Sequence, residues 1–246
     1  MTPRLDILPE GQRLLWPHLR DMPKDFVLYG GTALALRYAH RPSVDFDFFT
    51  SKQGMDLQKT GEALPVVTKF RHDVEKISEH HIDFLLDVNG HFVKLTLLNN
   101  RDIAPGSINP PDVSEDNGIK IATPLDIMAY KVLALHSRSE AKDYVDVAEM
   151  IQQGISLQKG FAAALAIAKL SRLGAGRLML DRLQGDFCSK SVAQIVSSVS
   201  ELASRSKECA EILRQAAQSL DITKVYAAGM KAQACIERDA TRERAR

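Results

Sequence analysis

The feature that most constrains the fold of this chain is an apolar run that ends in two glycines and leads into a helix. Residues 26–29 read FVLY, which is typical of a buried strand. Gly30 and Gly31 break this run, and Thr32 stands where a helix N-cap is expected. A glycine pair at a helix start lets a phosphate approach the backbone N–H groups and the positive end of the helix dipole. We therefore expect these three residues to bind phosphate, with a tight strand-to-helix turn as the ordinary alternative.

The next predicted strand carries two aspartates on one face. The segment SVDFDFF, which follows a predicted turn, alternates between polar and apolar residues. Side chains on a strand alternate between its two faces, so Val44, Phe46 and Phe48 are expected to enter the core. Asp45 and Asp47 then share the other face. Two neighbouring carboxylates repel each other, and a divalent cation relieves that repulsion. The two aspartates are therefore candidate ligands of Mg²⁺ or Mn²⁺, with a solvated strand face as the alternative.

A later helix carries two candidate phosphate-binding cations. Thr123, Pro124 and Asp126 supply a cap, a proline at the first helical position and an acid three residues after the cap, so a helix is expected to begin there. That helix carries Lys131, and Arg138 lies two turns further on at the same azimuth. Both cations can bind an anion, the arginine with its bidentate fork. A solvated helix lysine is the alternative for Lys131.

These motifs resemble a known family. The stretch GGTALAL followed by RPSVDFDFF, and then the string IATPLDIMAYKVLALHSRSEAKDYVDV, are similar to the two sequence blocks of the AbiEii/AbiGii-type toxins, which have the nucleotidyltransferase fold. The resemblance covers residues 26–150, with both motifs in the order of the family. It implies an α+β fold, in which a nucleotidyltransferase-like mixed sheet flanked by helices is followed by a C-terminal helical domain.

The resemblance also implies a reaction and a set of roles. Such enzymes transfer a nucleoside monophosphate from a nucleoside triphosphate (NTP) to an acceptor oxygen and release pyrophosphate, and they rely on cations and fixed dipoles. The implied acceptor is RNA, notably the tRNA 3′ end, or a protein, and the implied partner is a cognate antitoxin. The expected metal ligands are Asp45 and Asp47, the expected nucleotide-binding residues are Gly30, Gly31, Thr32, Lys131 and Arg138, and the expected catalytic residues are Asp45, Asp47, Lys131 and Asp143. Asp143 is expected to steer Lys131 or Arg138, whereas Asp146 is interpreted as structural.

A hairpin is expected in the middle of the first half of the chain. Two strand-like runs, residues 81–88 and 91–98, are separated by Asn89 and Gly90, which is a strong signal for a two-residue turn. With that turn, Asp83 is expected to pair with Thr96, because the partners follow by counting outward from the turn.

The hairpin bears on the completeness of the metal site. The nucleotidyltransferase fold often supplies a third carboxylate from a later strand, but the segment VKLTL at residues 93–97 contains no acid. Thr96 stands where that acid is expected, so we expect Thr96 to line the face that carries Asp45 and Asp47. Asp83 is a second candidate for that face, and an ordinary solvent-facing strand acid is its alternative.

Composition places few further limits on function. The chain has 246 residues and a formal net charge of +1, so any polyanion site must be a local patch. Its three cysteines are odd in number and widely spaced, which argues against a disulfide framework or a zinc site and favours a reducing cytoplasm. The N-terminus shows no apolar signal core, and no segment has membrane-spanning length. We therefore expect a cytoplasmic protein with no membrane partner.

The sequence predicts two domains and is compatible with three functions. Residues 1–153 are expected to form the nucleotidyltransferase-like core, and residues 154–246, rich in alanine and leucine, a helical domain of four or five helices. The leading hypothesis is a metal-dependent nucleotidyltransferase that acts as the toxin of a toxin–antitoxin or abortive-infection pair. A catalytically inactive nucleotide- or RNA-binding protein on the same fold is the alternative, and an enzyme that modifies a small molecule is a weaker third.

Overall fold

The fold was analysed in a computed structural model of the chain, which describes residues 1–99, 108–168, 180–183 and 191–244. The described residues pack as two compact units, Met1–Thr123 and Pro124–Arg246. This division reflects packing, whereas the boundary expected after residue 153 concerns domain organisation and stays a prediction.

The first unit is built on one mixed sheet. Its strand order is β3-β4-β5-β2-β1-β7-β6. The β2–β5 and β1–β7 pairs are parallel, and the other neighbours are antiparallel. The strands are β1 (Val27–Tyr29), β2 (Asp45–Thr50), β3 (Arg71–Ser78), β4 (His81–Val88), β5 (His91–Asn99), β6 (Asp112–Val113) and β7 (Lys120–Ile121). The helices of this unit are α1 (Glu10–Leu15), α2 (Gly30–Tyr38), α3 (Leu57–Glu62) and α4 (Pro65–Lys69), with 3-10 turns at Leu5–Ile7 and Trp16–Asp21.

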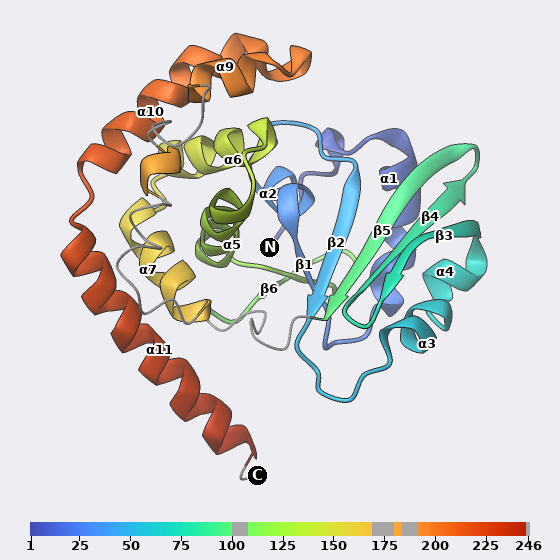
Figure 1. The fold of residues 1–246 in the computed structure, drawn as a ribbon. Helices are drawn as coiled ribbons and strands as arrows, with labels where there is room; N and C mark the ends of the chain where they lie inside the picture. The colour runs from blue at the N-terminus through green and yellow to red at the C-terminus, as the bar shows by residue number, and fades with distance from the viewer. Residues whose placement is uncertain (100–107, 169–179, 184–190, 245–246) are drawn as a thin grey trace. The chain divides into compact units, whose positions relative to one another are not determined.

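One face of the sheet is covered by helices and forms the core. Phe46 and Phe48 of β2 are fully buried, as predicted. A Cβ added to Gly61 of α3 would meet the Phe84 ring of β4, so α3 packs tightly on this face; α3 lies beside the sheet in Figure 1. Val44 is 54% exposed, so its predicted place in the core is wrong. The reason is that β2 begins only at Asp45, and the alternation of faces does not extend to the residue before the strand.

The predicted hairpin and its register are confirmed. Asn89 and Gly90 both have positive φ angles, 55° and 86°, as a two-residue turn between twisted strands requires. Val88 pairs with His91, and Asp83 pairs with Thr96. The register continues into β2, where Thr96 pairs with Asp47. Asp47, Thr96 and Asp83 therefore form one row across three strands, on the face opposite the helix-covered core.

The second unit is helical in its described residues. It contains α5 (Pro124–Ser137), α6 (Ala141–Gln152), α7 (Leu157–Ile167), α9 (Val192–Ser197), a 3-10 turn at Ser200–Arg205, α10 (Ser206–Gln218) and α11 (Ile222–Arg244). α7 and α11 lie side by side (Figure 1), and Gly229 of α11 fits against the Ala162 backbone. The predicted fold class, a mixed sheet flanked by helices and followed by C-terminal helices, is confirmed.

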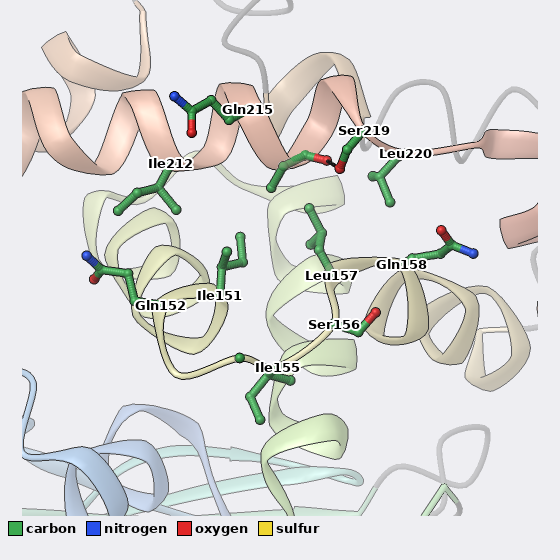
Figure 2. Close-up of a pocket in the computed structure, with 12 residues that line it drawn as sticks. Ile151, Gln152, Ile155, Ser156, Leu157, Gln158, Ile212, Gln215, Ser219 and Leu220 are labelled. Atoms are coloured by element: carbon green, nitrogen blue, oxygen red, sulfur yellow. Dashed lines mark hydrogen bonds between the residues drawn. The ribbon is translucent and has the colours of Figure 1, made fainter.

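A surface hollow in the second unit is lined without charged side chains. It has a volume of about 580 Å³ and lies between the end of α6, the start of α7 and α10 (Figure 2). Its twelve lining residues are uncharged, and aliphatic side chains such as Ile151, Ile212 and Leu220 alternate with glutamines and serines. Phosphate transfer needs cations or acids, so this hollow is not a candidate active site.

The structure describes two of the three cysteines. Cys209 and Cys235 are free thiols, and burial raises the pKa of Cys209 to about 12, so Cys209 is inert as a thiolate. Cys188, also counted in the sequence, lies outside the described residues. Within the described part of the chain, no helix is both long and apolar enough to cross a membrane.

Candidate active site

The turn between β1 and α2 is the first component of the site. Gly30 has φ +73°, a conformation that side chains with a Cβ rarely adopt, and α2 begins at this residue. The helix starts two residues before the predicted cap, and Tyr29 holds the cap position without a side-chain bond. The prediction that Thr32 caps the helix is therefore wrong. The Thr32 hydroxyl instead donates a hydrogen bond to the backbone oxygen of Asp45, which ties α2 to β2.

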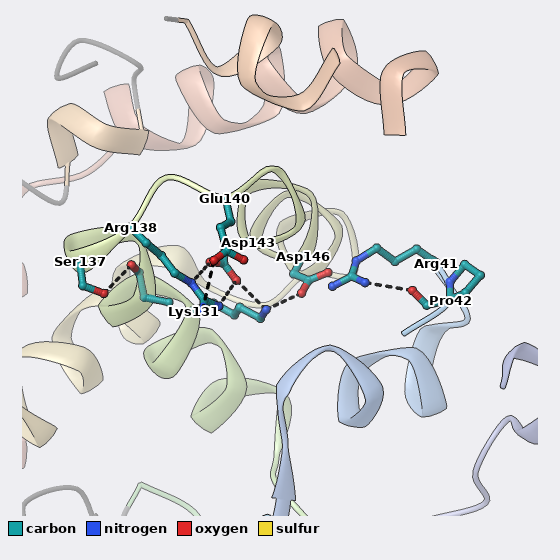
Figure 3. A network of polar contacts seen from close by, with 9 residues as sticks. Arg41, Pro42, Lys131, Ser137, Arg138, Glu140, Asp143 and Asp146 are labelled. Carbon is teal, nitrogen blue, oxygen red and sulfur yellow. Dashed lines mark hydrogen bonds and ion pairs between the residues drawn. The ribbon is translucent and has the colours of Figure 1, made fainter. Parts of the chain in front are cut away.

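The two glycines leave room for polar side chains against the backbone. A Cβ on Gly30 would overlap the carboxylate of Asp47, and a Cβ on Gly31 would lie 2.7 Å from the Arg41 guanidinium and 2.8 Å from the Ser43 hydroxyl. The glycine turn and Asp47 are thus in direct contact. Arg41 is buried, and its guanidinium donates to the Pro42 carbonyl (Figure 3). Arg41 was not among the residues predicted for the site, and its place just before the Asp-x-Asp strand is the signal that could have found it.

Gly30 permits a test with a matched control. Gly30→Ala should abolish transfer activity, because the added methyl group displaces the Asp47 carboxylate and the positive φ is strained, at a cost of about 1–2 kcal/mol. Gly54→Ala is the control, since Gly54 has φ +71° but no atom within 4 Å of an added Cβ. Both variants should lose unfolding free energy in urea titrations, and Gly30→Ala should lose more, because only its added methyl group also meets a side chain. Equal activity of the two variants would show that Gly30 acts only through backbone strain.

Asp45 and Asp47 lie side by side on the face opposite the buried phenylalanines. Both are half-buried, and the residues between and after them, Phe46 and Phe48, point to the core. Asp45 pairs with Lys94 across β2 and β5, and Asp47 pairs with Thr96. The expectation that the two carboxylates share a face is confirmed.

The place expected for a third acid is filled by a neutral residue and its partners. Thr96 lies on the same face as Asp47, as predicted, and its hydroxyl donates to Asp83 over 2.8 Å. Asp83 also contacts His81 at 2.7 Å and the Lys94 ammonium at 3.1 Å. Asp83 is 4% exposed, so its interpretation as a solvent-facing acid is wrong. Since three side chains already occupy its oxygens, Asp83 is also poorly placed to serve as a metal ligand.

The partners of Asp83 set its charge. Burial alone would raise its pKa, but hydrogen bonds from Thr96, His81 and Lys94 outweigh burial and lower the pKa. For Lys94, burial would lower the pKa, whereas Asp83 and Asp45 raise it. Lys94 therefore carries a positive charge that two acids share. In the sequence, Lys94 was named only as part of the segment VKLTL, which contains no acid.

The lowered pKa of Asp83 gives a pH prediction. A group whose pKa is lower in the folded state stabilises the fold above its ordinary value, here 3.8, and that stabilisation is lost as pH falls through the folded value. Asp83→Asn should therefore lower Tm at pH 7, and the difference from the wild type should shrink below pH 3.8. Thermal unfolding by circular dichroism measures this. A difference that stays constant down to pH 3 (roughly one unit below the ordinary value) would contradict the assigned charge.

The residues present fit a magnesium ion held by two carboxylates. Within the described ranges, no group of three or more histidine, cysteine, aspartate or glutamate side chains could hold a metal ion. Asp45 and Asp47 are thus a two-carboxylate set. Mg²⁺ usually keeps several waters and is held by one or two carboxylates together with substrate phosphates, which matches such a set.

The second unit contains a buried cluster of two cations and two acids (Figure 3). Lys131 of α5 lies 2.8 Å from Asp143 and 2.7 Å from Asp146, both on α6. Arg138, directly after α5, donates to Asp143 from Nε over 2.8 Å. Asp143 therefore contacts both cations, as the sequence suggested. Asp146 is fully buried and contacts Lys131 directly, and its spacing of three residues from Asp143 on one helix face was the overlooked signal.

The cluster is balanced in charge. Burial would lower the pKa of Lys131, but Asp146 and Asp143 outweigh it and raise the pKa, so the ammonium stays charged. Burial would raise the pKa of Asp143, but Lys131 and Arg138 lower it. Lys131 is 8% exposed, whereas half of the Arg138 side chain is exposed. Arg138 is therefore the more accessible of the two cations.

Known structures share this fold. The structure of MenT4, the nucleotidyltransferase toxin Rv2826c from Mycobacterium tuberculosis H37Rv, superposes with a TM-score of 0.64 at 14% identity, over 92% of this chain and 93% of that one. A crystal structure of an H. pylori protein assigned as a nucleotidyltransferase superposes with a TM-score of 0.55 at 20% identity, over 90% and 94% of the two chains. At these identities the likeness establishes the fold alone. The class is therefore the nucleotidyltransferase fold.

The family follows from the sequence. The family model described as "Nucleotidyl transferase AbiEii toxin, Type IV TA system" matches residues 18–221, which is most of the chain. The chain belongs to this family. It is also 34% identical over 124 residues to the uncharacterized protein aq_aa25 of Aquifex aeolicus (strain VF5). That match covers 50% of this chain and 56% of the relative, so the chain spans about half the length of the relative it matches.

Proposed function

We propose that this protein is a metal-dependent nucleotidyltransferase that moves a nucleoside monophosphate from an NTP to an RNA or protein acceptor, and that it acts in the cytoplasm as the toxin of a toxin–antitoxin pair. The observation that carries the proposal is the contact between the Gly30 backbone and the Asp47 carboxylate, with Asp45 on the same face. A phosphate turn and a carboxylate pair meet there in one site. The family supports both the reaction and a cognate antitoxin as partner.

Each group has a proposed task. Asp45 and Asp47 hold Mg²⁺ or Mn²⁺, which when bound supplies charge neutralisation at the phosphate oxygens. The backbone N–H groups at the start of α2 bind phosphate, while the Thr32 hydroxyl remains bonded to the Asp45 carbonyl and keeps the turn and strand in register. Lys131 and Arg138 bind the triphosphate, and Asp143 holds both cations in position. These roles follow from the family motif and the contacts within each unit.

A second candidate is nucleotide or RNA binding without catalysis. The neutral Thr96 at the place of a third acid, with Asp83 engaged by three partners, is the observation that favours it. The two candidates differ in one outcome, since the inactive protein would bind NTP but transfer nothing.

The test is incubation of the protein with each α-labelled NTP in turn, together with total RNA or total protein, with Mg²⁺ or with a chelator. The proposal predicts label on a macromolecule in the presence of Mg²⁺ and none with the chelator. Treatment of the product with ribonuclease or protease identifies the acceptor class. NTP binding without label transfer under every condition would support the inactive alternative instead.

A further inference from the structure

Lys94 of β5 lies beside the carboxylate pair on the same face of the sheet. It is the register partner of Asp45 across the parallel strands β2 and β5. Side chains alternate along β5, so this lysine shares a face with Thr96, and its neighbours Val93 and Leu95 are buried on the core face. Neighbouring strands of a sheet are only about 4.8 Å apart. The Lys94 side chain therefore borders a ligand that Asp45 holds on the β5 side.

The ammonium of Lys94 is fixed in position and still accessible. It lies 3.1 Å from Oδ2 of the buried Asp83, while His81 and Thr96 both contact Oδ1 of that carboxylate. The Lys94 side chain is 35% exposed. An ammonium has three N–H donors, so one can bind Asp83 while the others remain for a ligand. Asp83 thus holds a cation beside the carboxylate pair without removing it from solvent.

The strand order places the glycine turn and Lys94 on opposite sides of the carboxylate pair. β2 lies between β1 and β5 in the sheet. The Gly30 turn directly follows β1 and meets the Asp47 carboxylate from that side, whereas Lys94 belongs to β5. In nucleotidyl transfer the leaving and attacking oxygens lie roughly in line on opposite sides of the reacting phosphorus. With the leaving pyrophosphate at the glycine turn, the acceptor approaches from the β5 side.

An exposed aromatic side chain extends the β5 side of the site. Phe92 precedes Lys94 by two residues on the same strand, so the two side chains point to one face. The Phe92 side chain is 69% exposed. Proteins bind single strands of nucleic acid by stacking bases on aromatic rings while cations follow the phosphate backbone. The cation and the open ring therefore favour a nucleic-acid strand over a polypeptide on this side.

We propose that Lys94 is an acceptor-binding residue, whose ammonium binds a backbone phosphate of a single-stranded RNA end that approaches Asp45 and Asp47 from the β5 side. Phe92 stacks on a base of the same strand. The inference rests on the proposed function, because the in-line geometry of transfer assigns the β5 side to the acceptor. It adds to that function a class of acceptor and the side from which the acceptor enters.

The experiment measures equilibrium binding of a 5′-fluorescein-labelled single-stranded oligoribonucleotide to the full-length protein, with Mg²⁺ and a non-hydrolysable NTP analogue, at a series of KCl concentrations. Lys94→Met should weaken binding by about tenfold, the contribution of one charged hydrogen bond. It should also reduce the slope of log affinity against log salt by about 0.7, the share of one phosphate of a single strand. Lys94→Arg keeps the charge and should restore both quantities. Calorimetric titration with the NTP analogue alone should give equal affinities for the wild type and Lys94→Met.

Lys76→Met is the matched control. Lys76 is an exposed lysine on β3 that is also a register partner of Asp83, but β4 and β5 separate β3 from β2. Its loss should leave the oligoribonucleotide affinity and the salt slope unchanged. Equal losses in Lys76→Met and Lys94→Met would show a general effect of positive charge and overturn the assignment. If Lys94→Met fails to fold, the double variant with Asp83→Asn, which removes both charges of the pair, takes its place.

Phe92→Ala tests the same strand at an exposed position. It should weaken oligoribonucleotide binding by about 5- to 150-fold, the contribution of stacking one base, and leave the salt slope unchanged because no charge is removed. Unchanged binding in both Phe92→Ala and Lys94→Met overturns the proposal.

Two further outcomes identify a different ligand for Lys94. Weaker binding of the NTP analogue to Lys94→Met, with unchanged binding of the oligoribonucleotide, would assign the lysine to the triphosphate and overturn the proposal. Lys94-dependent binding of an acidic unstructured peptide, with no binding of the oligoribonucleotide, would overturn it in favour of a protein acceptor. If no acceptor is ever labelled but oligoribonucleotide binding still depends on Lys94, the proposed transfer fails while the RNA contact stands.

Discussion

Asp45→Asn and Asp47→Asn should each abolish Mg²⁺-dependent nucleotidyl transfer while the fold remains intact. Each substitution keeps the size of the side chain and removes one of the two carboxylates that face away from the core. Removing one preorganised electrostatic group from an active site costs roughly 10²–10³-fold in rate, and a two-carboxylate metal set has no spare ligand. Label transfer from NTP, at matched protein concentration, measures the effect. Tm should stay the same or rise, because the repulsion between neighbouring carboxylates is relieved.

A matched control uses another strand acid. Asp73→Asn changes an exposed aspartate on β3, which should leave both transfer and Tm unchanged. Wild-type transfer in Asp45→Asn or Asp47→Asn would remove that residue from the metal site. Unfolding of either variant, with Asp73→Asn folded, would make the aspartates structural.

Lys131→Met should cause the largest loss of stability among the site variants. The substitution leaves Asp143 and Asp146, both fully buried, without the ammonium that lies 2.8 and 2.7 Å away. Breaking a buried ion pair by removal of one partner costs about 3–5 kcal/mol. Lys159→Met, on the exposed face of α7, is the control and should cost little. Urea titrations give the unfolding free energies, and addition of Asp146→Asn to Lys131→Met should restore part of the loss. A loss equal to that of the control would contradict the buried pairing.

Arg138→Gln separates ligand binding from stability within the same cluster. Half of this side chain is exposed and Asp143 keeps the Lys131 ammonium, so its removal should cost less unfolding free energy than Lys131→Met. If Arg138 binds the triphosphate, its loss should weaken NTP affinity by about tenfold or more, the contribution of one charged hydrogen bond. Calorimetric titration with a non-hydrolysable NTP analogue measures this. Unchanged affinity would leave the cluster with a structural role alone.

Local patterns in the sequence were sufficient for much of the fold. The Asn89-Gly90 turn fixes the register of the hairpin. In that register Asp83 pairs with Thr96. Strict alternation placed Asp45 and Asp47 on one face. These features depend on residues that are close in sequence, so propensity and period are enough to predict them.

Tertiary contacts account for what the sequence analysis missed. Thr32 looked like a cap because it precedes helix formers, but Gly30 can begin the helix at a positive φ, which frees the Thr32 hydroxyl to bind the Asp45 carbonyl. Asp83 is buried because Lys94, His81 and Thr96 converge on it from two strands. Such convergence depends on side-chain directions across strands, which composition and spacing do not determine. The catalytic and binding roles of the site residues stay predictions until the variants are measured.

The most direct test of the central claim follows the two ends of the triphosphate in one reaction. The wild-type protein is incubated with Mg²⁺, its acceptor and an NTP labelled either at the α-phosphate or at the γ-phosphate. Nucleotidyl transfer predicts that α-label becomes bound to the acceptor while γ-label leaves as pyrophosphate. Acceptor labelled from the γ-position, or release of inorganic phosphate with no labelled acceptor, would contradict the account.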